Sequence, residues 1–350
     1  MAVPSANEPP ATPRAPELGV DVAIVAYRGW EFTRTTLEHL RRQTIEHRVV
    51  LCDNGCDQGT AERARAEFPE VKVIRLERNM TCAVSCNASV AAGEREIVVV
   101  MNNDVEPRPD FLERLTAPFA GRPRLGSAAP LLLRPGEREV DSEGLVADPT
   151  LAAFPRFKGL APERARGEAG PVLTGPDGTI AAFRRAAWRQ MGGMDESILA
   201  YQEDFDLGLR LRVAGWETAA ALDAVAVHVG SATWGHRSRD QRRNSGHARG
   251  YYLRRYGVLR TRIAPRALLA EAIVVAGDLV LSHDTAALRG RLAGWRQAAG
   301  LPPLPWPPPE AIDRRIGFLD SMRLRRAVYM RPPTAGTVDD PDFGRATQAA

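Results

Sequence analysis

The sequence predicts an α/β protein whose central sheet is doubly wound and mostly parallel, flanked by helices and followed by a C-terminal helical extension. Three observations predict this class. Short β-branched runs alternate with helical patterns, polar residues follow four successive strands, and the region after residue 257 is helical and rich in arginine. The 350 residues contain 44% hydrophobic residues, which suffices for a large core and argues against a disordered or fibrous protein.

The first half of the chain has the spacing of successive strand and helix units. We expect strands at residues 20–26, 48–52, 71–76 and 97–101, with helices at about 32–40, 60–68 and 81–92 between them. Ligands of such sheets bind beyond the carboxyl ends of the strands, so we expect the functional site there.

The second half is less regular. Residues 133–171 are rich in Gly, Pro and charge, which predicts long loops or hairpins. A turn at 192–195 precedes a helix at 203–214 that ends at Gly215, and a short strand follows at 225–229. The proline-rich segment 301–309 is predicted to be a stiff linker or wrapping segment.

Charge and the two ends of the chain limit the classes of function. Lys and Arg total 47 against 43 Asp and Glu, a balance too even for a dedicated nucleic-acid surface. Residues 1–18 hold five prolines and lack the apolar core of a signal peptide, so we expect a disordered leader and a cytoplasmic protein. The apolar stretch 267–282 is interrupted by Glu271 and Asp278 and is too short to predict a membrane span. Peripheral contact with the inner face of a membrane stays open as an alternative.

The four cysteines form two pairs with three residues between the members of each pair: Cys52 with Cys56, and Cys82 with Cys86. Zinc knuckles and redox motifs usually have two intervening residues. We therefore expect reduced thiols, with a zinc or disulfide cluster as the open alternative.

Polar residues stand at the ends of the first four predicted strands, where the fold class places its ligands. Each group alone would be an ordinary polar loop, but four in succession predict a nucleotide-type site. In chain order the groups are Tyr27-Arg28, Asp53-Asn54, Arg78-Asn79 and Asn102-Asn103-Asp104.

Sugar transfer from a nucleoside diphosphate needs a cation, a base and groups that hold the nucleoside. Asp104, with Asn102 two residues earlier, supplies hard oxygen ligands for Mn²⁺ or Mg²⁺, although such residues also form turns. Asp204 starts a helix on the face of its apolar residues, while Asp206 points elsewhere, so Asp204 is a candidate base. His228, at a strand end, is either a structural histidine or a third metal ligand.

The ordered motifs resemble the family-2 inverting glycosyltransferases of GT-A fold, especially their bacterial rhamnosyltransferase-like branch. The resemblance covers about residues 20–257. It rests, in chain order, on Asp53-Asn54-Gly55, Asp57-Gln58-Gly59-Thr60, Glu77-Arg78-Asn79, Asn102-Asn103-Asp104-Val105, Asp141-Ser142-Glu143-Gly144, Gly192-Gly193-Met194-Asp195-Glu196, Tyr201-Gln202-Glu203-Asp204-Phe205-Asp206-Leu207, Leu211-Arg212-Val213-Ala214-Gly215-Trp216 and His228-Val229-Gly230-Ser231-Ala232-Thr233. Cys56, Cys82, Cys86 and Asp177 depart from the residues usual in that family.

The resemblance implies a GT-A domain at 19–257, with a nucleotide-binding half at 19–132 and an acceptor and catalytic half at 133–257, before the extension at 258–350. It implies that Asp204 is the base and that Glu203 is its close companion. It further implies Mn²⁺ or Mg²⁺ held by Asp104, Asn102 and His228. The implied donor-binding residues, among which Asp53 contacts a pyrimidine base, are Ala26, Tyr27, Asp53, Arg78, Asn79, Asn102, Asn103 and Asp104.

The expected function is inverting transfer of a sugar from a pyrimidine nucleotide-sugar, of dTDP-rhamnose or UDP-hexose type, by metal-assisted single displacement. The acceptor would be a hydroxyl of a glycan, a lipid-linked intermediate or a small molecule. One alternative is a sugar nucleotidyltransferase, for which Arg28-Gly29-Trp30 is a poor version of the triphosphate loop. Another is a catalytically silent protein of the same fold with a cysteine-bound metal.

Overall fold

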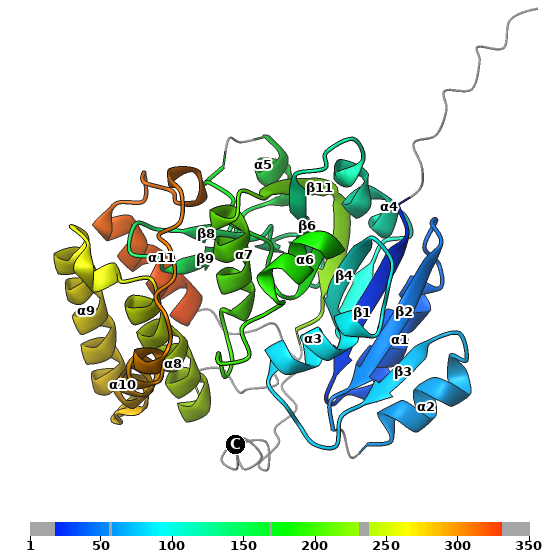
Figure 1. The fold of residues 1–350 in the computed structure, drawn as a ribbon, viewed down its shortest axis with the longest axis horizontal. Helices are drawn as coiled ribbons and strands as arrows, with labels where there is room; N and C mark the ends of the chain where they lie inside the picture. Colours follow the sequence, from blue (N-terminus) through cyan, green and yellow to red (C-terminus); the bar gives the residue numbers. More distant parts are fainter. Residues whose placement is uncertain (1–17, 56–57, 168–169, 231–237, 331–350) are drawn as a thin grey trace, which may run out of the picture.

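The computed structural model describes residues 18–55, 58–167, 170–230 and 238–330 (Figure 1). The predicted leader, apart from Leu18, lies outside these residues. So do Cys56 and Asp57 of the second strand-end loop and the motif residues Ser231, Ala232 and Thr233.

A mixed sheet forms the centre of the described chain. Its path runs β3-β2-β1-β4-β10-β6-β11-β5, and β7 pairs with β6 beside this path. The strands are β1 (Val20–Ala26), β2 (His47–Asp53), β3 (Lys72–Arg75), β4 (Ile97–Asn102), β5 (Val105–Pro107), β6 (Leu125–Leu133), β7 (Val140–Ser142), β10 (Ile180–Arg184) and β11 (Glu217–His228).

Most strands of this sheet are parallel, as predicted. β1 pairs in parallel with β2 and β4, β2 with β3, and β6 with β11. β10 runs antiparallel to both β4 and β6, and β5 runs antiparallel to β11. A small separate sheet joins β8 (Leu145–Ala147) to β9 (Ala153–Pro155).

Helices flank the sheet and continue into a C-terminal group of helices (Figure 1). Those of the first two-thirds of the chain are α1 (Trp30–Leu40), α2 (Thr60–Glu67), α3 (Cys82–Ala91), α4 (Phe111–Thr116), α5 (Pro162–Gly167), α6 (Arg185–Met191) and α7 (Glu203–Val213). The C-terminal group comprises α8 (Arg239–Arg255), α9 (Ala264–Ser282), α10 (Ala286–Gln297) and α11 (Phe318–Met330). None of the helices in the described residues is long and apolar enough to cross a lipid bilayer.

Both faces of the sheet are buried because β1 alternates between two apolar clusters. Val20, Val22 and Ile24 pack with residues of α1 and α4. Ala23 joins the opposite cluster, which contains residues of α3, α6 and α7. This alternation is the two-residue period of a strand covered on both sides.

A third apolar cluster joins α7 to the C-terminal group of helices. Phe205 of α7 and Tyr252 of α8 share it with Ala267 of α9, Ala298 and Ile312. The segment 301–309 follows α10 and returns to α8, where the Leu304 amide donates to the Arg255 carbonyl at 2.7 Å. The proline-rich segment therefore wraps the helices.

The sequence does not predict several of the elements, and for three segments (β6, the first half of β11 and α8) there is a physical reason. β6 is buried along its whole length and lacks an alternating pattern. The first half of β11 is rich in alanine, and a register shift between Ala221 and Val225 separates it from the predicted strand. α8 buries Arg242, His247 and Arg249, so it shows no apolar periodicity.

Candidate active site

The register of the parallel strands brings the predicted strand-end residues to one edge of the sheet. Ala26 at the end of β1 lies opposite Asp53 of β2, and Val25 lies opposite Asn102 of β4. Asp53 in turn lies opposite Arg75 of β3. The sheet thus brings these predicted strand-end residues to the same edge.

Asp53 is buried, and its carboxylate contacts other groups of the protein. Its Oδ2 accepts a hydrogen bond from the Ala61 amide at 3.2 Å, near the start of α2, and lies 3.7 Å from Nε of Arg75. The carboxylate therefore fixes the position of α2 against the sheet. Its predicted contact with a pyrimidine base stays a prediction.

The loops after β2 and β3 are locked together. Asn54 Nδ2 donates to Asn79 Oδ1 and to the Met80 carbonyl, both at 3.0 Å. Gly55 has a φ of +70°, and a Cβ there would lie 2.2 Å from the carbonyl carbon of Arg78. Only glycine fits this approach. Arg78 and Asn79 are thereby held beside the end of β2.

Asn103 holds the first loop rather than pointing into open space. Its Nδ2 donates to the Arg28 carbonyl at 2.9 Å and to Thr33 Oγ1 at 2.8 Å. The Arg28 guanidinium lies over the Tyr27 ring, 5.1 Å from the centroid. Asn103 thus holds the loop that carries Tyr27 and Arg28 in position. The sequence predicts a contact between Asn103 and the donor but not this positioning role.

Asp104 faces His228, and His228 is held by Asp141. His228 Nε2 lies 3.6 Å from Asp104 Oδ2, and Nδ1 lies 2.8 Å from Asp141 Oδ2. The Val229 amide donates to the Asp104 carbonyl at 3.0 Å, which joins the end of β11 to the turn after β4. A carboxylate on one ring nitrogen, with the other nitrogen turned to a second carboxylate, is the arrangement of many metal-binding histidines.

The two carboxylates change the charge of this histidine. Burial would lower the pKa of His228, but its hydrogen bonds to Asp104 and Asp141 and their charges raise it to about 10. Burial likewise opposes ionisation of Asp141, yet contact with His228 and Lys158 holds the pKa of Asp141 below its usual value. The two carboxylates therefore favour the protonated form of His228 at neutral pH.

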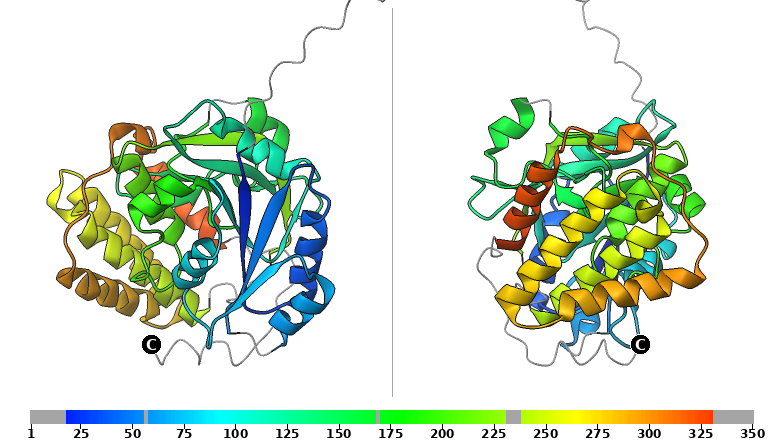
Figure 2. Two further views of the ribbon diagram at one scale, coloured as in Figure 1. Left: turned by 45° about the vertical axis from the view of Figure 1, so that its right-hand side comes forward. Right: turned by 90° about the vertical axis from the view of Figure 1, so that its left-hand side faces the viewer.

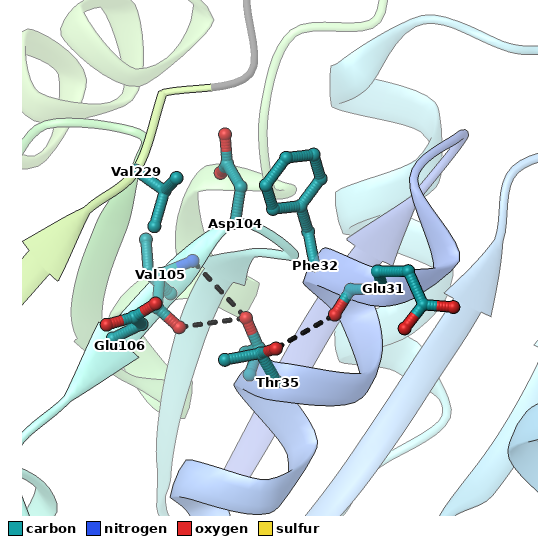
Figure 3. A pocket seen from close by; sticks show the side chains of 8 residues that line it. Glu31, Phe32, Thr35, Asp104, Val105, Glu106 and Val229 are labelled. Carbon is teal, nitrogen blue, oxygen red and sulfur yellow. Dashed lines mark hydrogen bonds between the residues drawn. The ribbon is translucent and has the colours of Figure 1, made fainter. Parts of the chain in front are cut away.

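A cavity of about 180 Å³ opens beside Asp104. Figure 3 shows the Asp104 side chain projecting between Phe32 of α1 and Val229, with Val105 and Glu106 of β5 below it. The Thr36 hydroxyl donates to the Val105 carbonyl at 2.8 Å and fixes α1 against β5. Small-molecule sites usually measure about 300–1,000 Å³, so this cavity could hold only part of a nucleotide-sugar.

A short hydrogen-bonded path connects the end of β4 to Asp204. The Asn102 amide donates to the Thr179 carbonyl at 2.9 Å. The neighbouring Gly178 amide donates to Asp204 Oδ2 at 2.7 Å. A Cβ at Gly178 would lie only 3.0 Å from that oxygen, so the glycine permits the close approach. The predicted base thus lies next to the strand end that carries Asn102.

Asp204 belongs to a cluster of carboxyl groups. Burial, followed by the charges of Glu203 and Asp177, raises the pKa of Asp204 to about 8. Burial also raises the pKa of Glu203. Glu203 Oε2 is buried and has no hydrogen-bond partner among the described residues. A carboxyl group whose pKa lies near neutral pH is suited to accept a proton during catalysis.

Three cysteines of the described residues, Cys52, Cys82 and Cys86, are free thiols, and Cys82 interacts with Glu203 of this cluster. Cys82 Sγ lies 3.7 Å from Cys86 Sγ, one helical turn further along α3. Contact with Cys86, followed by burial, raises the pKa of Cys82, and burial raises the pKa of Cys52 to about 11. The thiols of Cys52 and Cys82 are therefore protonated at neutral pH. In the described part of the chain, no three His, Cys, Asp or Glu side chains are grouped to hold a metal ion.

The start of α7 is strained and is braced by α8. Tyr201 and Gln202, just before Glu203, have φ angles of +67° and +71°, which non-glycine residues rarely adopt. The Tyr252 hydroxyl donates to the Gln202 carbonyl. The Tyr251 and Tyr256 hydroxyls donate to Asp195 and Asp206 at 2.6 and 2.8 Å.

Asp206 is more deeply buried than the sequence indicates. It is fully buried, and Arg210 Nε lies 2.5 Å from its Oδ2. With the Tyr256 hydroxyl also bound, its carboxylate is engaged by the protein. Asp206 is therefore a structural residue of α7, while Asp204 faces the Gly178 loop.

Sequence reasoning missed the parts played by Asp141, Asp177 and the α8 tyrosines. Asp141 stands in one of the motifs, but its partner His228 is 87 residues away. The sequence shows Asp177 only as a departure from the small residue usual in the family, and not that its charge acts on Asp204. No periodic signal marks the tyrosines, whose partners lie on other elements.

The mixed central sheet with helices on both faces has the fold of the GT-A glycosyltransferases. The chain belongs to the family described as "Glycosyltransferase like family 2", whose profile matches residues 16–247. It is therefore a family 2 glycosyltransferase. The predicted fold and enzyme class are confirmed.

Similar proteins agree with this assignment. The chain is 30% identical over 202 residues to N-acetylglucosaminyl-diphospho-decaprenol L-rhamnosyltransferase of Mycobacterium tuberculosis, in strains CDC 1551 / Oshkosh and ATCC 25618 / H37Rv. That alignment covers 51% of this chain and 66% of the relative, just under two thirds of its length. In fold the chain is similar to GalNAc-T7, solved with UDP, GalNAc and Mn²⁺, with a TM-score of 0.52 at 14% identity, covering 73% of this chain and 54% of that one.

Proposed function

We propose that this enzyme transfers a sugar, with inversion, from a pyrimidine nucleotide-sugar to the hydroxyl of a lipid-linked acceptor. The observation that carries the proposal is the path from Asn102 through Thr179 and Gly178 to Asp204. It places a carboxyl group with a pKa of about 8 next to the strand end that leads to Asp104. A proton acceptor and a diphosphate-binding edge are what a single displacement requires.

Asp204 would act as the base. It takes the proton of the acceptor hydroxyl while the hydroxyl oxygen attacks the anomeric carbon of the donor. The bond from that carbon to the diphosphate oxygen breaks with its electron pair leaving on the diphosphate, so the configuration inverts. Glu203 and Asp177 keep the pKa of Asp204 high enough for it to accept the proton.

Asp104 and His228 would hold Mn²⁺ or Mg²⁺ together with the donor phosphates, with Asn102 as a further oxygen ligand. The donor set fits, because Asp141 occupies Nδ1 of His228 and leaves Nε2 turned toward Asp104. Mg²⁺ sites commonly combine one or two protein carboxylates with substrate phosphates. Such an ion neutralises the departing diphosphate, and the Mn²⁺ in the GalNAc-T7 structure supports this choice.

The donor and acceptor are proposed by analogy with the relatives. The rhamnosyltransferase of M. tuberculosis is named for an L-rhamnose donor group and a diphospho-decaprenol acceptor. We therefore place dTDP-rhamnose first and a UDP-hexose second, with a lipid-linked sugar ahead of a free glycan or a small molecule. Ala26, Tyr27, Asp53, Arg78, Asn79, Asn103 and Asn102 remain the proposed donor-binding residues beside Asp104. The division into halves at 19–132 and 133–257, followed by the extension, is proposed on the same basis.

The two alternatives receive less support. Membership in a glycosyltransferase family does not favour a sugar nucleotidyltransferase. A silent protein with a cysteine-bound metal would need a third ligand beside Cys82 and Cys86. The described residues provide no such group.

The test is an assay of donor turnover with Mn²⁺ and a panel of dTDP- and UDP-sugars. We expect nucleoside diphosphate to be released when a lipid-linked acceptor is present. Asp204→Asn should lower kcat about 10²- to 10⁴-fold while donor binding persists, and Asp104→Asn should weaken donor binding. Asp223→Asn, at an exposed position of β11, is the matched control. Release of pyrophosphate, or full activity of Asp204→Asn, would refute the proposal.

A further inference from the structure

Helix α9 differs from an ordinary surface helix because it exposes large apolar side chains and buries charged ones. Six of its large apolar side chains point away from the protein, with between 43% and 68% of each exposed. These side chains form one continuous face: Leu268, Leu269, Ile273, Leu279, Val280 and Leu281. Surface helices normally bury such a stripe, so this face needs an apolar partner.

The inward side of α9 holds the charged residues of the helix. Glu271 is buried and lies 2.7 Å from Arg249 Nε of α8 and 2.8 Å from Arg291 Nε of α10. About two turns further on, Asp278 is buried and pairs with Arg242. Rotating α9 to bury its leucines would break these ion pairs and leave buried charges unpaired. The outward apolar face is thus fixed by the structure.

Helix α10 also exposes large apolar side chains. Leu288 and Leu292, one turn apart, are 40% and 46% exposed. The exposed Arg289 lies beside them, and Arg296 follows Leu292 by one turn. In the right-hand view of Figure 2, α9 and α10 lie at the front of the molecule, with the sheet behind them. We call the outward side of these two helices the apolar face.

The charge of this region selects the partner. Residues 258–330 contain eleven arginines and no lysine against six acidic residues, although the whole chain has a net charge of only +4. Two of those six, Glu271 and Asp278, are buried and paired, and Glu271 engages Arg291 and Arg325 among the eleven arginines. An exposed apolar stripe bordered by cations matches the interface of an anionic lipid bilayer.

We propose that the apolar face of α9 and α10 docks on the surface of an anionic membrane, with the helices lying in the interface and the flanking arginines on the lipid headgroups. The face is joined to the catalytic segment, because α8 packs against α10 and its tyrosines hold the residues around α7. Docking would therefore hold the carboxyl cluster at a fixed distance from the bilayer. The proposal depends on the surface alone and stands or falls apart from the sugar-transfer reaction.

A second copy of this chain is the competing occupant. Two copies meeting through this face would bring the excess of arginines on each copy together, which opposes association. The observations therefore favour the bilayer.

The experiment is co-sedimentation of the full-length protein with vesicles of phosphatidylcholine alone and of an equal mixture of phosphatidylcholine and phosphatidylglycerol. We expect binding to the anionic vesicles, weakened by salt. Ile273→Glu and Val280→Glu should each lower the partition coefficient about tenfold or more. Arg289→Gln and Arg296→Gln should each lower it roughly fivefold. Ala66→Glu, at an exposed position of α2 remote from the apolar face, should bind like the natural protein (Figure 1).

Three results would overturn the proposal. The first two are that the natural protein does not bind anionic vesicles, or that Ile273→Glu binds them as tightly as Ala66→Glu does. The third is that light scattering shows a dimer that Ile273→Glu converts to monomers, because the apolar face would then be a subunit interface. Hydrogen exchange of the natural protein is the measurement that does not depend on a variant folding. Anionic vesicles should slow exchange in α9 and α10 and leave α2 unchanged, and no change in α9 would contradict docking.

Discussion

At the residue scale, the behaviour of Asp204 depends on the charges placed around it. Burial, Glu203 and Asp177 all favour its protonated form, while the Gly178 and Phe205 amides favour the carboxylate. The residue that should accept a proton is therefore partly protonated at neutral pH. A base with this environment works best once the pH exceeds its pKa.

The first prediction concerns the pH dependence of the reaction. Because Asp204 must be ionised to act, kcat/KM should rise tenfold per pH unit below about 8 and reach a plateau above it. Asp177→Asn removes one like charge, so it should shift the profile to lower pH. The measurement is initial rate against pH, with Asp223→Asn as a control that should leave the profile in place. A profile that is flat through neutral pH would contradict Asp204 as the base.

The second prediction concerns His228 and metal binding. Its pKa of about 10 lies above the ordinary value of 6.5. Its ion pairs therefore stabilise the metal-free protein fully below pH 6.5, and this stabilisation is lost as the pH rises toward about 10. Only a neutral imidazole binds a metal. Mn²⁺ binding without donor should thus release a proton and strengthen as the pH rises.

Calorimetric titration with Mn²⁺ in two buffers of different ionisation enthalpy measures this proton release. His228→Asn should abolish the release while Mn²⁺ still binds weakly through Asp104. Equal heats in both buffers for the natural protein would show that His228 gives up no proton. Removing Asp141 by Asp141→Asn should lower the His228 pKa and reduce the pH dependence of Mn²⁺ binding.

At the scale of elements, α8 and α10 cross unusually closely through glycines. Gly246 and Gly250 of α8 face the backbone of α10, and Gly290 and Gly294 of α10 face that of α8. A Cβ on Gly290 would lie 2.0 Å from the Arg243 carbonyl oxygen. Two such glycine pairs, each with three residues between its members, let helix backbones approach closely. Because these contacts are with backbone atoms, a substituted side chain cannot be accommodated by a rotamer change.

The third prediction follows from this crossing. Gly290→Ala should lower the free energy of unfolding by about 1–3 kcal/mol or more, because the added methyl group overpacks the interface. Gly277→Ala is the matched control, since it lies in α9 and its Cβ would meet no atom within 4 Å. It should stabilise the helix by about 0.5–1 kcal/mol. Chemical denaturation of both variants distinguishes the two positions, and equal stabilities would refute the crossing as a tight contact.

At the scale of the whole molecule, local sequence patterns predicted the elements whose burial follows a simple period. β1 has the bounds Val20–Ala26 that its β-branched run indicates, and α7 begins at Glu203 as expected. His228 stands at the end of β11, as its apolar run predicts. The strand-end residues meet because parallel strands align their ends.

What the sequence could not supply depends on contacts between distant segments. α8 is held by buried ion pairs such as Arg249 with Glu271, 22 residues further along the chain, so no apolar period reveals it. The hydrogen bond between Asp141 and His228 depends on a hairpin region whose sequence has little regular hydrophobic pattern. The outward face of α9 is likewise invisible to a hydropathy pattern, which shows that a helix is apolar but not which side it buries.

The last prediction concerns how much the C-terminal extension stabilises the rest of the chain. The apolar cluster that contains Phe205 of α7 and Tyr252 of α8 also contains Ala267, Ala298 and Ile312. The C-terminal region is also hydrogen-bonded to β8, because the Asp313 amide donates to the Ala147 carbonyl at 2.8 Å. Removing residues 258–350 should therefore destabilise the remaining domain rather than release it intact. Aliphatic side chains lose about 1.5–3 kcal/mol each when exposed, so the loss should reach about 5 kcal/mol or more.

Such a loss corresponds to a fall in Tm of about 10 °C or more. It should appear first around α7, because α8 would lose the helices that hold its tyrosines against Gln202 and Asp206. Calorimetry of the chain ending at residue 257 measures the change, with a chain ending at residue 330 as the control. Hydrogen exchange should show the loss of protection spreading from α8 to α7 while β1 and β2 remain protected. If the shortened chain unfolded at the same temperature as the control, the extension would be an independent unit, and the strained start of α7 would have to be maintained by the sheet alone.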